Sequence, residues 1–218
     1  MNDQERLADI HNRALVKKIS PDELDWVASE LQKYPSELSC IQMLMILARQ
    51  EAKQYRSLVE RFLEYQGEWF CVAEALGTLC RWWKDTHLYV DYLLRYMGAI
   101  EGENYSLVDV SYVRIVAIHL AGEYLRNNQE PRLLSRLIEL YENSDLPELR
   151  FIKDPNARAW EIQFERGSVK GDAYLALADA MGQDYRTLPH IENEEDLVNK
   201  ADPQIVIRAK ERLKEEGL

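Results

Sequence analysis

Apolar residues recur three and four positions apart along almost the whole chain, and this spacing constrains the fold more than any other feature. Residues at that spacing lie on one face of an α-helix, whereas a half-buried strand needs strict alternation. The chain has only nine glycines and no Asn-Gly or Asp-Gly pair between alternating apolar runs, so the usual hairpin signals are absent. The sequence therefore predicts an all-α fold whose neighbouring helices pack antiparallel.

Several helix starts are marked by capping residues. Ser20, followed by Pro21 and Glu23, has the pattern of a capping box with proline in the first turn. The Asp154-Pro155 and Asp202-Pro203 pairs have the pattern of an N-cap followed by a first-turn proline. Between such signals we expect helices at about 36–50, 53–65, 68–84, 86–97, 107–126, 133–141 and 172–181, and one around Trp160 and Phe164.

A helix rich in small residues recurs along the chain, with Leu or Met just before Ala or Gly. It is found at 43–50, 72–79, 116–125 and 174–182, and aligning Ala48, Gly77, Gly122 and Gly182 gives irregular steps of 29, 45 and 60 residues. Small residues allow one helix to lie close against the next, so this pattern is typical of stacked helix pairs.

The segments VAEALGTL (72–79) and VRIVAIHLAGEYL (113–125) resemble the second helix of a HEAT-like repeat. The resemblance is loose and covers about residues 36–182, and only Val113-Arg114 matches the usual turn signature. A tetratricopeptide array is the runner-up, although its strict 34-residue period is missing. An irregular helical bundle with chance matches is the third interpretation. Both repeat families form α-solenoids that serve mainly as protein-binding scaffolds, so the resemblance implies a binding function.

The length of 218 residues suits one large domain or one continuous helical array. We predict a single α-solenoid-like domain over residues 1–218. Capping helices would occupy 1–35, helical-pair repeats 36–182, and a charged helical segment 183–218. The ends need capping because each repeat leaves an apolar side uncovered.

The charge balance bears on partners and location. The chain carries 27 Lys and Arg against 38 Asp and Glu, a net charge of −11, which disfavours nucleic acid and anionic membranes. A basic protein partner would instead be attracted. No apolar run has the length of a signal peptide or a membrane span. Cys40, Cys71 and Cys80 lie among apolar neighbours without a CxxC spacing, so we expect three reduced core thiols in a cytoplasmic protein.

We find no pattern that predicts catalysis, a cofactor or a metal site. The chain lacks a P-loop, GxGxxG, HExxH, GxSxG and paired CxxC. His119 and Glu123 lie four apart on a helix, but such a pair is usually a surface hydrogen bond. HEAT-like proteins include DNA glycosylases and bilin lyases, and in the former Trp82, Trp83 and Asp179 would be the matching residues. The net charge of −11 opposes that assignment.

The sequence is therefore expected to encode a non-enzymatic protein-binding module. Its most concrete form is an acidic inhibitor or immunity-type protein that masks a basic partner such as a nuclease toxin. A scaffold or adaptor subunit of a larger assembly is the alternative. The inner helices would present the partner-binding side chains, which are the polar and aromatic residues off the apolar stripe: Glu74, Arg81, Trp82, Tyr112, His119, Glu123 and Asp179.

Overall fold

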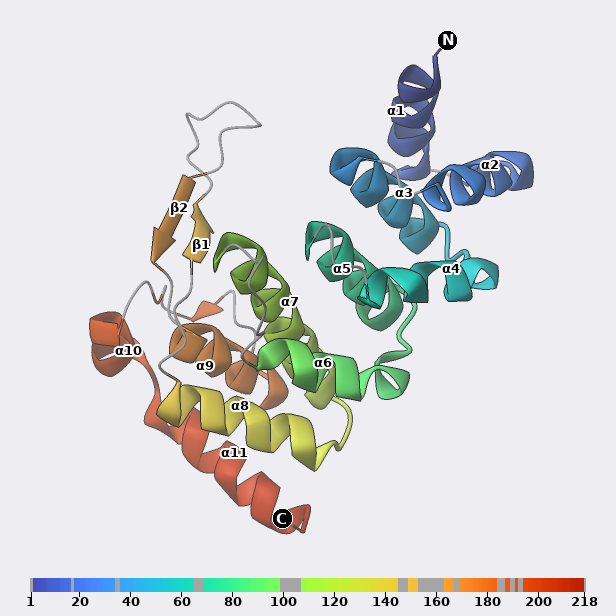
Figure 1. Ribbon diagram of the computed structural model, residues 1–218. Helices are drawn as coiled ribbons and strands as arrows, with labels where there is room; N and C mark the ends of the chain where they lie inside the picture. Colours follow the sequence, from blue (N-terminus) through green and yellow to red (C-terminus); the bar gives the residue numbers. More distant parts are fainter. Residues whose placement is uncertain are drawn as a thin grey trace. The chain divides into compact units, whose positions relative to one another are not determined.

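The computed structural model describes residues 2–16, 18–33, 36–64, 69–98, 107–144, 149–152, 163–166, 169–183, 187–188, 191 and 194–217 (Figure 1). The chain divides into two compact units, Met1–Tyr89 and Val90–Leu218, called here the N-terminal and C-terminal units. The single-domain organisation stays a prediction.

The N-terminal unit is built around α3, which contacts α1, α2 and α5 (Figure 1). Two capping boxes fix its helix starts: Asn2 with Glu5 begins α1, and Ser20 with Glu23 begins α2 as the sequence predicted. Its elements are α1 (Asp3–Ala14), α2 (Pro21–Leu31), α3 (Glu37–Arg49), the 3-10 turn η1 (Lys53–Tyr55), α4 (Arg56–Glu60), the 3-10 turn η2 (Arg61–Glu64), α5 (Trp69–Leu76), the π-helical segment η3 (Gly77–Trp82) and the 3-10 turn η4 (Thr86–Leu88).

The C-terminal unit is built around α9, which contacts α7, α8 and α11 (Figure 1). Its elements are α6 (Val90–Met97), α7 (Leu107–Leu125), α8 (Pro131–Asn143), β1 (Leu149–Ile152), β2 (Gln163–Arg166), α9 (Val169–Ala180), α10 (Glu194–Lys200) and α11 (Pro203–Glu215). The strands β1 and β2 form one short antiparallel pair with Phe151 opposite Phe164.

The close approach of α7 and α9 depends on a glycine. A Cβ atom on Gly122 would lie 2.6 Å from the carbonyl oxygen of Ala176 and 2.8 Å from its Cα. Both distances are shorter than non-bonded atoms tolerate, so only glycine allows the two backbones to meet here. The expectation that a small residue brings two helices together is confirmed at this crossing.

The helix α11 holds the ends of α7 and α9 through one arginine. Nη1 of Arg212 donates to the carbonyl oxygens of Leu125 at 2.9 Å and Ala180 at 3.1 Å, which lie in the last turns of those helices. Nη2 donates to the carbonyl of Asn128 at 2.6 Å, and Nε to Glu216 at 2.7 Å. A cation is favoured there because the last carbonyls of a helix carry partial negative charge.

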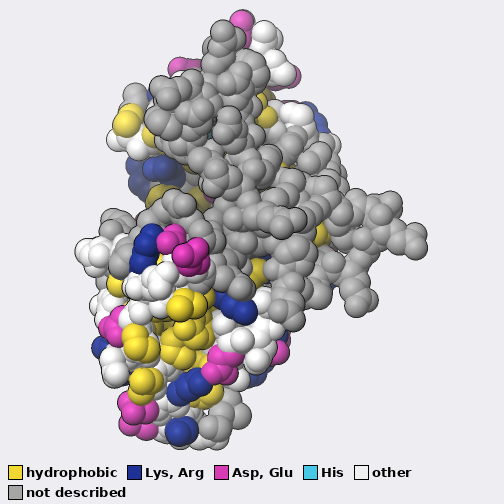
Figure 2. All heavy atoms as spheres, turned by 90° about the vertical axis from the view of Figure 1, so that its left-hand side faces the viewer, with side chains coloured by type: hydrophobic (Ala, Val, Ile, Leu, Met, Phe, Trp, Pro, Cys, Tyr) yellow, Lys and Arg dark blue, Asp and Glu magenta, His cyan; other side chains and the backbone are white. Residues whose placement is uncertain are grey.

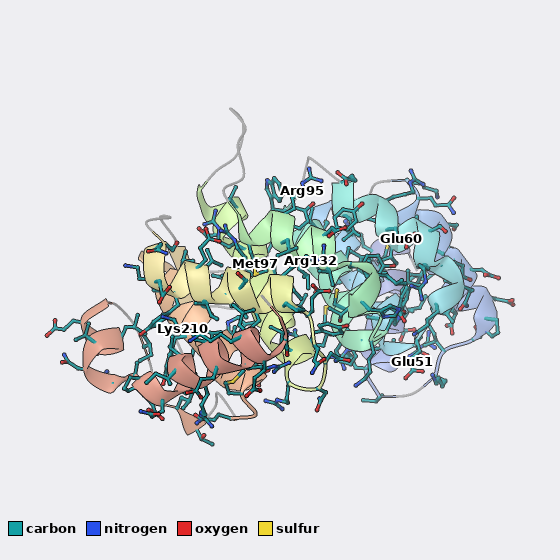
Figure 3. All side chains as sticks on the ribbon, turned by 90° about the horizontal axis from the view of Figure 1, so that it is seen from below. Glu51, Glu60, Arg95, Met97, Arg132 and Lys210 are labelled. Atoms are coloured by element: carbon teal, nitrogen blue, oxygen red, sulfur yellow. The ribbon has the colours of Figure 1, made fainter. Side chains whose placement is uncertain are left out.

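Ion pairs also join helices at the surface of the C-terminal unit. Arg132 of α8 and Lys210 of α11 are labelled in Figure 3. Arg132 donates to Asp91 of α6 at 2.8 Å, and Lys210 pairs with Glu142 of α8. These side chains are exposed, so each pair adds little to stability.

The all-α prediction is confirmed, apart from the β1–β2 pair. Most helices lie where they were expected, including the starts at Pro21 and Pro203. The helix predicted around Phe164 is wrong, because that residue lies in β2. Phe164 has polar neighbours on both sides, and this alternation is the strand pattern. Trp160 and Asp154-Pro155 lie outside the described residues.

Three predicted helices are broken in the structure. The segment expected as one helix at 86–97 is the 3-10 turn η4 followed by α6, with Tyr89 in neither. The segment expected as one helix at 53–65 is three short pieces between Lys53 and Glu64, and the helix at 68–84 changes from α to π at Gly77. Gly77 and Thr78 have low helix propensity, so the α form is weakly favoured there. The solenoid arrangement stays a prediction.

The cysteine prediction is confirmed in its structural part. Cys40, Cys71 and Cys80 are buried, and none of them forms a disulfide. No helix in the described ranges combines the length and apolar character that crossing a membrane requires.

Candidate functional site

The seven residues predicted to bind a partner divide between the two units. Glu74, Arg81 and Trp82 lie in the N-terminal unit, on α5 and η3. The other four lie in the C-terminal unit, on α7 and α9: Tyr112, His119, Glu123 and Asp179. The structure gives each group a distinct environment.

The N-terminal group adjoins a pocket that opens to solvent beside Trp82. The pocket has a volume of about 330 Å³, and we call it the Trp82 pocket. Three of its side chains are apolar and exposed, namely Leu15 and Trp82 at 41% each and Val16 at 83%. The complete described lining is Ala14, Leu15, Val16, Lys18, Arg49, Gln50 and Trp82.

One wall of the Trp82 pocket is fixed by Gln50, the buried residue that follows α3. Its side-chain Nε2 donates to the carbonyl of Ala14 at 3.1 Å, and its Oε1 accepts from the backbone N–H of Ile19 at 3.2 Å. The two bonds join the end of α3 to both sides of the segment after α1. Leu15 and Val16 lie between these two anchor points.

The π-helical segment places Trp82 at the pocket. The backbone N–H of Trp83 donates to the carbonyl of Thr78 at 2.9 Å, a bond that spans five residues instead of four. Trp83 is buried, while Trp82 is exposed. π-helical turns occur often at functional sites. Here the turn separates two adjacent tryptophans into a core residue and a surface residue.

An arginine covers the exposed indole. The guanidinium carbon of Arg49 lies 5.0 Å from the centre of the Trp82 ring, within the range of a cation–π contact. Arg49 and Arg81 both act electrostatically on Glu74 and favour its ionised form. Burial outweighs them and raises the pKa of Glu74 to about 7. Glu74 is a half-buried acid, not the exposed side chain that was expected.

The C-terminal group lies where α7 meets α9. Nε2 of His119 is 3.5 Å from a carboxylate oxygen of Asp172, a buried acid that the sequence interpretation did not select. Tyr112 and Glu123 are half-buried. The Gly122 crossing described above brings these two helices close together, so the polar side chains beside it are drawn into the interface.

Asp179 corrects an expectation. It was expected on an open inner face, but it is 4% exposed, and Arg126, the first residue after α7, pairs with its carboxylate. Burial raises the pKa of Asp179, with Arg126 acting in the opposite direction. All described residues of α9 except Lys170 and Leu175 are buried. The helix is enclosed by α7, α8 and α11, so its polar residues are part of the core.

Of the described lining of the Trp82 pocket, only Trp82 was selected from the sequence; Leu15, Val16, Lys18 and Arg49 are among the residues that were missed. A signal for the first two was present, because Leu15 and Val16 continue the apolar run beyond the end of α1 and are followed by lysines. No local pattern marked Arg49. Its contact with Trp82 joins residues that are 33 positions apart in the chain.

The described residues contain no group of three or more His, Cys, Asp or Glu side chains that could hold a metal ion. No model of a protein family, no curated protein and no solved structure matches the chain.

Proposed function

We propose that this chain is a non-enzymatic protein-binding module. The observation that carries the proposal is the exposed Trp82 with Arg49 against its ring, beside the exposed Leu15 and Val16. Tryptophan and arginine are the residue types that most often dominate binding energy at protein interfaces. Contiguous exposed apolar side chains are costly in water, and they are typical of a surface that a partner covers.

The concrete form that we propose is an acidic inhibitor or immunity-type protein that masks a basic partner such as a nuclease toxin. Its support is the net charge of −11, which steers a basic protein toward the chain over distances of about a Debye length. Acids can also occupy positions on the partner where phosphates bind.

A scaffold or adaptor is the second candidate, favoured by a separate observation on the C-terminal unit. Hydrophobic side chains gather on the face shown in Figure 2, with charged side chains around them. Val198 of α10 and Ile207 of α11 are exposed large apolar residues of this unit. An adaptor needs two binding surfaces, one for each partner.

The test begins with affinity purification of the full chain from its native host and identification of the bound protein by mass spectrometry. We expect a partner with a basic contact surface and an association rate that falls as salt concentration rises. Trp82→Ala should raise the dissociation rate about tenfold or more, because a central aromatic contributes through buried contact. Leu88→Ala is the matched control, since Leu88 is an exposed apolar residue of the same unit outside the Trp82 pocket.

An acidic partner, or an association rate insensitive to salt, would contradict the inhibitor form. Equal dissociation rates for Trp82→Ala and the unmodified chain would remove the Trp82 pocket from the interface. Simultaneous binding of two different proteins would favour the adaptor.

A further inference from the structure

We infer that the Trp82 pocket binds an acidic peptide segment of a partner protein, with an aromatic or leucine side chain beside a carboxylate. The inference rests on the proposed protein-binding function and adds the chemistry of one contact. The charge of the surface as a whole is expected to attract basic proteins, so this pocket would have the opposite preference.

The pocket carries positive charge. Lys18 and Arg49 are its two described charged lining residues, and both are basic. Arg81, next to Trp82 in the chain, adds a third positive charge close to Glu74. If Glu74 is fully ionised, these four side chains still carry two net positive charges. The charge around this pocket is therefore opposite in sign to the net charge of −11 that the whole chain carries.

Helix dipoles reduce this positive charge without cancelling it. The C-terminal ends of α1 and α3 both reach the pocket, at Ala14 and Arg49. Each helix end contributes about half a negative charge. The carbonyl of Ala14 already accepts a hydrogen bond from Gln50, so it is not directed at a ligand. Two net side-chain charges exceed the two half charges, and an anion remains favoured.

One side of the pocket is apolar. Leu15, Val16 and Trp82 are exposed beside the two basic residues, so apolar and cationic groups face the same small volume. The volume of about 330 Å³ lies at the low end of the roughly 300–1,000 Å³ of ligand pockets. It suits one large side chain and its neighbours. An amphiphilic anion, apolar on one side and charged on the other, matches both surfaces.

The pocket is also preorganised for a ligand. Gln50 holds the segment that carries Leu15 and Val16 at both sides, through Ala14 and Ile19. Arg49 is already placed over the Trp82 ring. A ligand therefore pays less entropy to order the pocket, which favours recognition of a short segment. Opposite charge preferences at the pocket and on the remaining surface would also fix the orientation of a mainly basic partner.

The experiment titrates two short capped peptides into the isotope-labelled full chain and follows the indole N–H of Trp82 by NMR. One peptide has a central phenylalanine between two glutamates, and in the other lysines replace the glutamates. The Trp82 signal is assigned by its loss in Trp82→Ala. We expect the acidic peptide to shift the signals of Trp82, Val16 and Arg49 at millimolar concentration, with affinity about tenfold higher than the lysine peptide.

Matched variants separate the two halves of the site. Arg49→Gln should weaken binding of the acidic peptide about fivefold or more, and Trp82→Ala should abolish it. Lys33→Gln and Leu88→Ala, which change exposed residues outside the pocket, should leave binding unchanged.

The inference is overturned if neither peptide shifts the pocket signals, if the lysine peptide binds equally well, or if Arg49→Gln has no effect. A dimer of the chain that dissociates on Trp82→Ala would also overturn it, since a second copy would then fill the pocket. These failures differ from failure of the proposed function. A purified partner that binds equally well after Trp82→Ala leaves the protein-binding function intact, whereas a peptide that binds without any protein partner supports the pocket alone.

Discussion

The central helices of the two units, α3 and α9, have closely similar ends and different surroundings. Both end in the same hydrogen-bond arrangement, in which the second residue beyond the cap donates back to the helix. In α3 the backbone N–H of Ala52 donates to the carbonyl of Leu47 at 3.0 Å, and in α9 the N–H of Gln183 donates to Ala178 at 2.9 Å. The residue with positive φ is Glu51 in the first and Gly182 in the second. The same hydrogen-bonded helix end is thus formed with two different residue types at the position of positive φ.

The surroundings differ because α9 is buried on nearly all sides, while the end of α3 opens onto the Trp82 pocket. The polar residues of α9 are consequently held by partners within the fold, as Asp179 is held by Arg126. Arg49 at the end of α3 instead covers an exposed indole. The comparison teaches that α9 encloses its polar residue Asp179 in the packed interior of its unit, whereas α3 keeps Arg49 exposed at its end.

The largest expected effect on stability distinguishes Gly122 from Gly77, which occupy equivalent positions in the recurring small-residue helix. Gly122→Ala should destabilise the C-terminal unit by about 3 kcal/mol or more, because the added Cβ would collide with the backbone of Ala176. Gly77→Ala is the matched control, since nothing lies within 4 Å of its Cβ position. We expect it to be neutral or stabilising by up to about 1 kcal/mol.

Urea unfolding of both variants, followed by circular dichroism, measures the difference. Equal midpoints for the two variants would mean that α7 and α9 can separate at low cost and that the crossing is not tightly packed.

The second effect concerns Glu74, a half-buried acid of the N-terminal unit. The pKa of Glu74 is about 7 in the folded chain, above the ordinary 4.5, so the folded state binds more protons than the unfolded state between these values. Stability should therefore fall as pH rises from about 4.5 to 7. Glu74→Gln removes this loss and should be more stable than the unmodified chain at pH 8, by on the order of 2 kcal/mol, with no such difference at pH 4.

Glu23→Gln gives the opposite control. Hydrogen bonds from Arg13 and from the backbone of Ser20 lower the pKa of Glu23 to about 2. Its contribution to stability is present above about 4.5 and is lost as pH falls toward 2, so this variant should be less stable than the unmodified chain at neutral pH. Thermal unfolding from pH 4 to pH 8 measures both variants. A Glu74→Gln curve parallel to that of the unmodified chain would show that Glu74 is ionised without cost.

Helix positions were predictable because their signals are local. The capping residue Ser20 and the apolar spacing of α7 are read from adjacent positions, and both predictions agree with the structure. The role of Gly122 was also predictable in kind, as a small residue at a helix crossing. Its difference from Gly77 was not, because the two glycines have similar sequence neighbours and differ in the helix that lies opposite.

The candidate site was only partly predictable for the same reason. Trp82 was selected as an aromatic residue off the apolar stripe, and it is exposed in the structure. The charged side chains of the pocket lining are Lys18 and Arg49, which are far from Trp82 in the chain. Asp179 was placed wrongly because helical spacing identifies the polar face of a helix but does not show whether another helix covers that face. Long-range packing decides both points.

The smallest expected effect sharpens the comparison of the two helix ends. Glu51 has φ of 52°, a left-handed conformation that costs a non-glycine residue about 1 kcal/mol, and its side chain is exposed (Figure 3). Glu51→Gly should therefore stabilise the N-terminal unit by about 0.5–1 kcal/mol, after allowance for the greater freedom of glycine in the unfolded chain. Gly182→Ala should destabilise the C-terminal unit by a similar amount, since Gly182 has φ of 79° and open space around its Cβ position.

Both midpoints can be measured by urea unfolding, with Lys33→Gly as a control for losing an exposed charged side chain near a helix end. If Glu51→Gly destabilises the unit, the Glu51 side chain stabilises this end of α3 by more than its backbone conformation costs. The two central helices would then be terminated by different means despite their common hydrogen bonds.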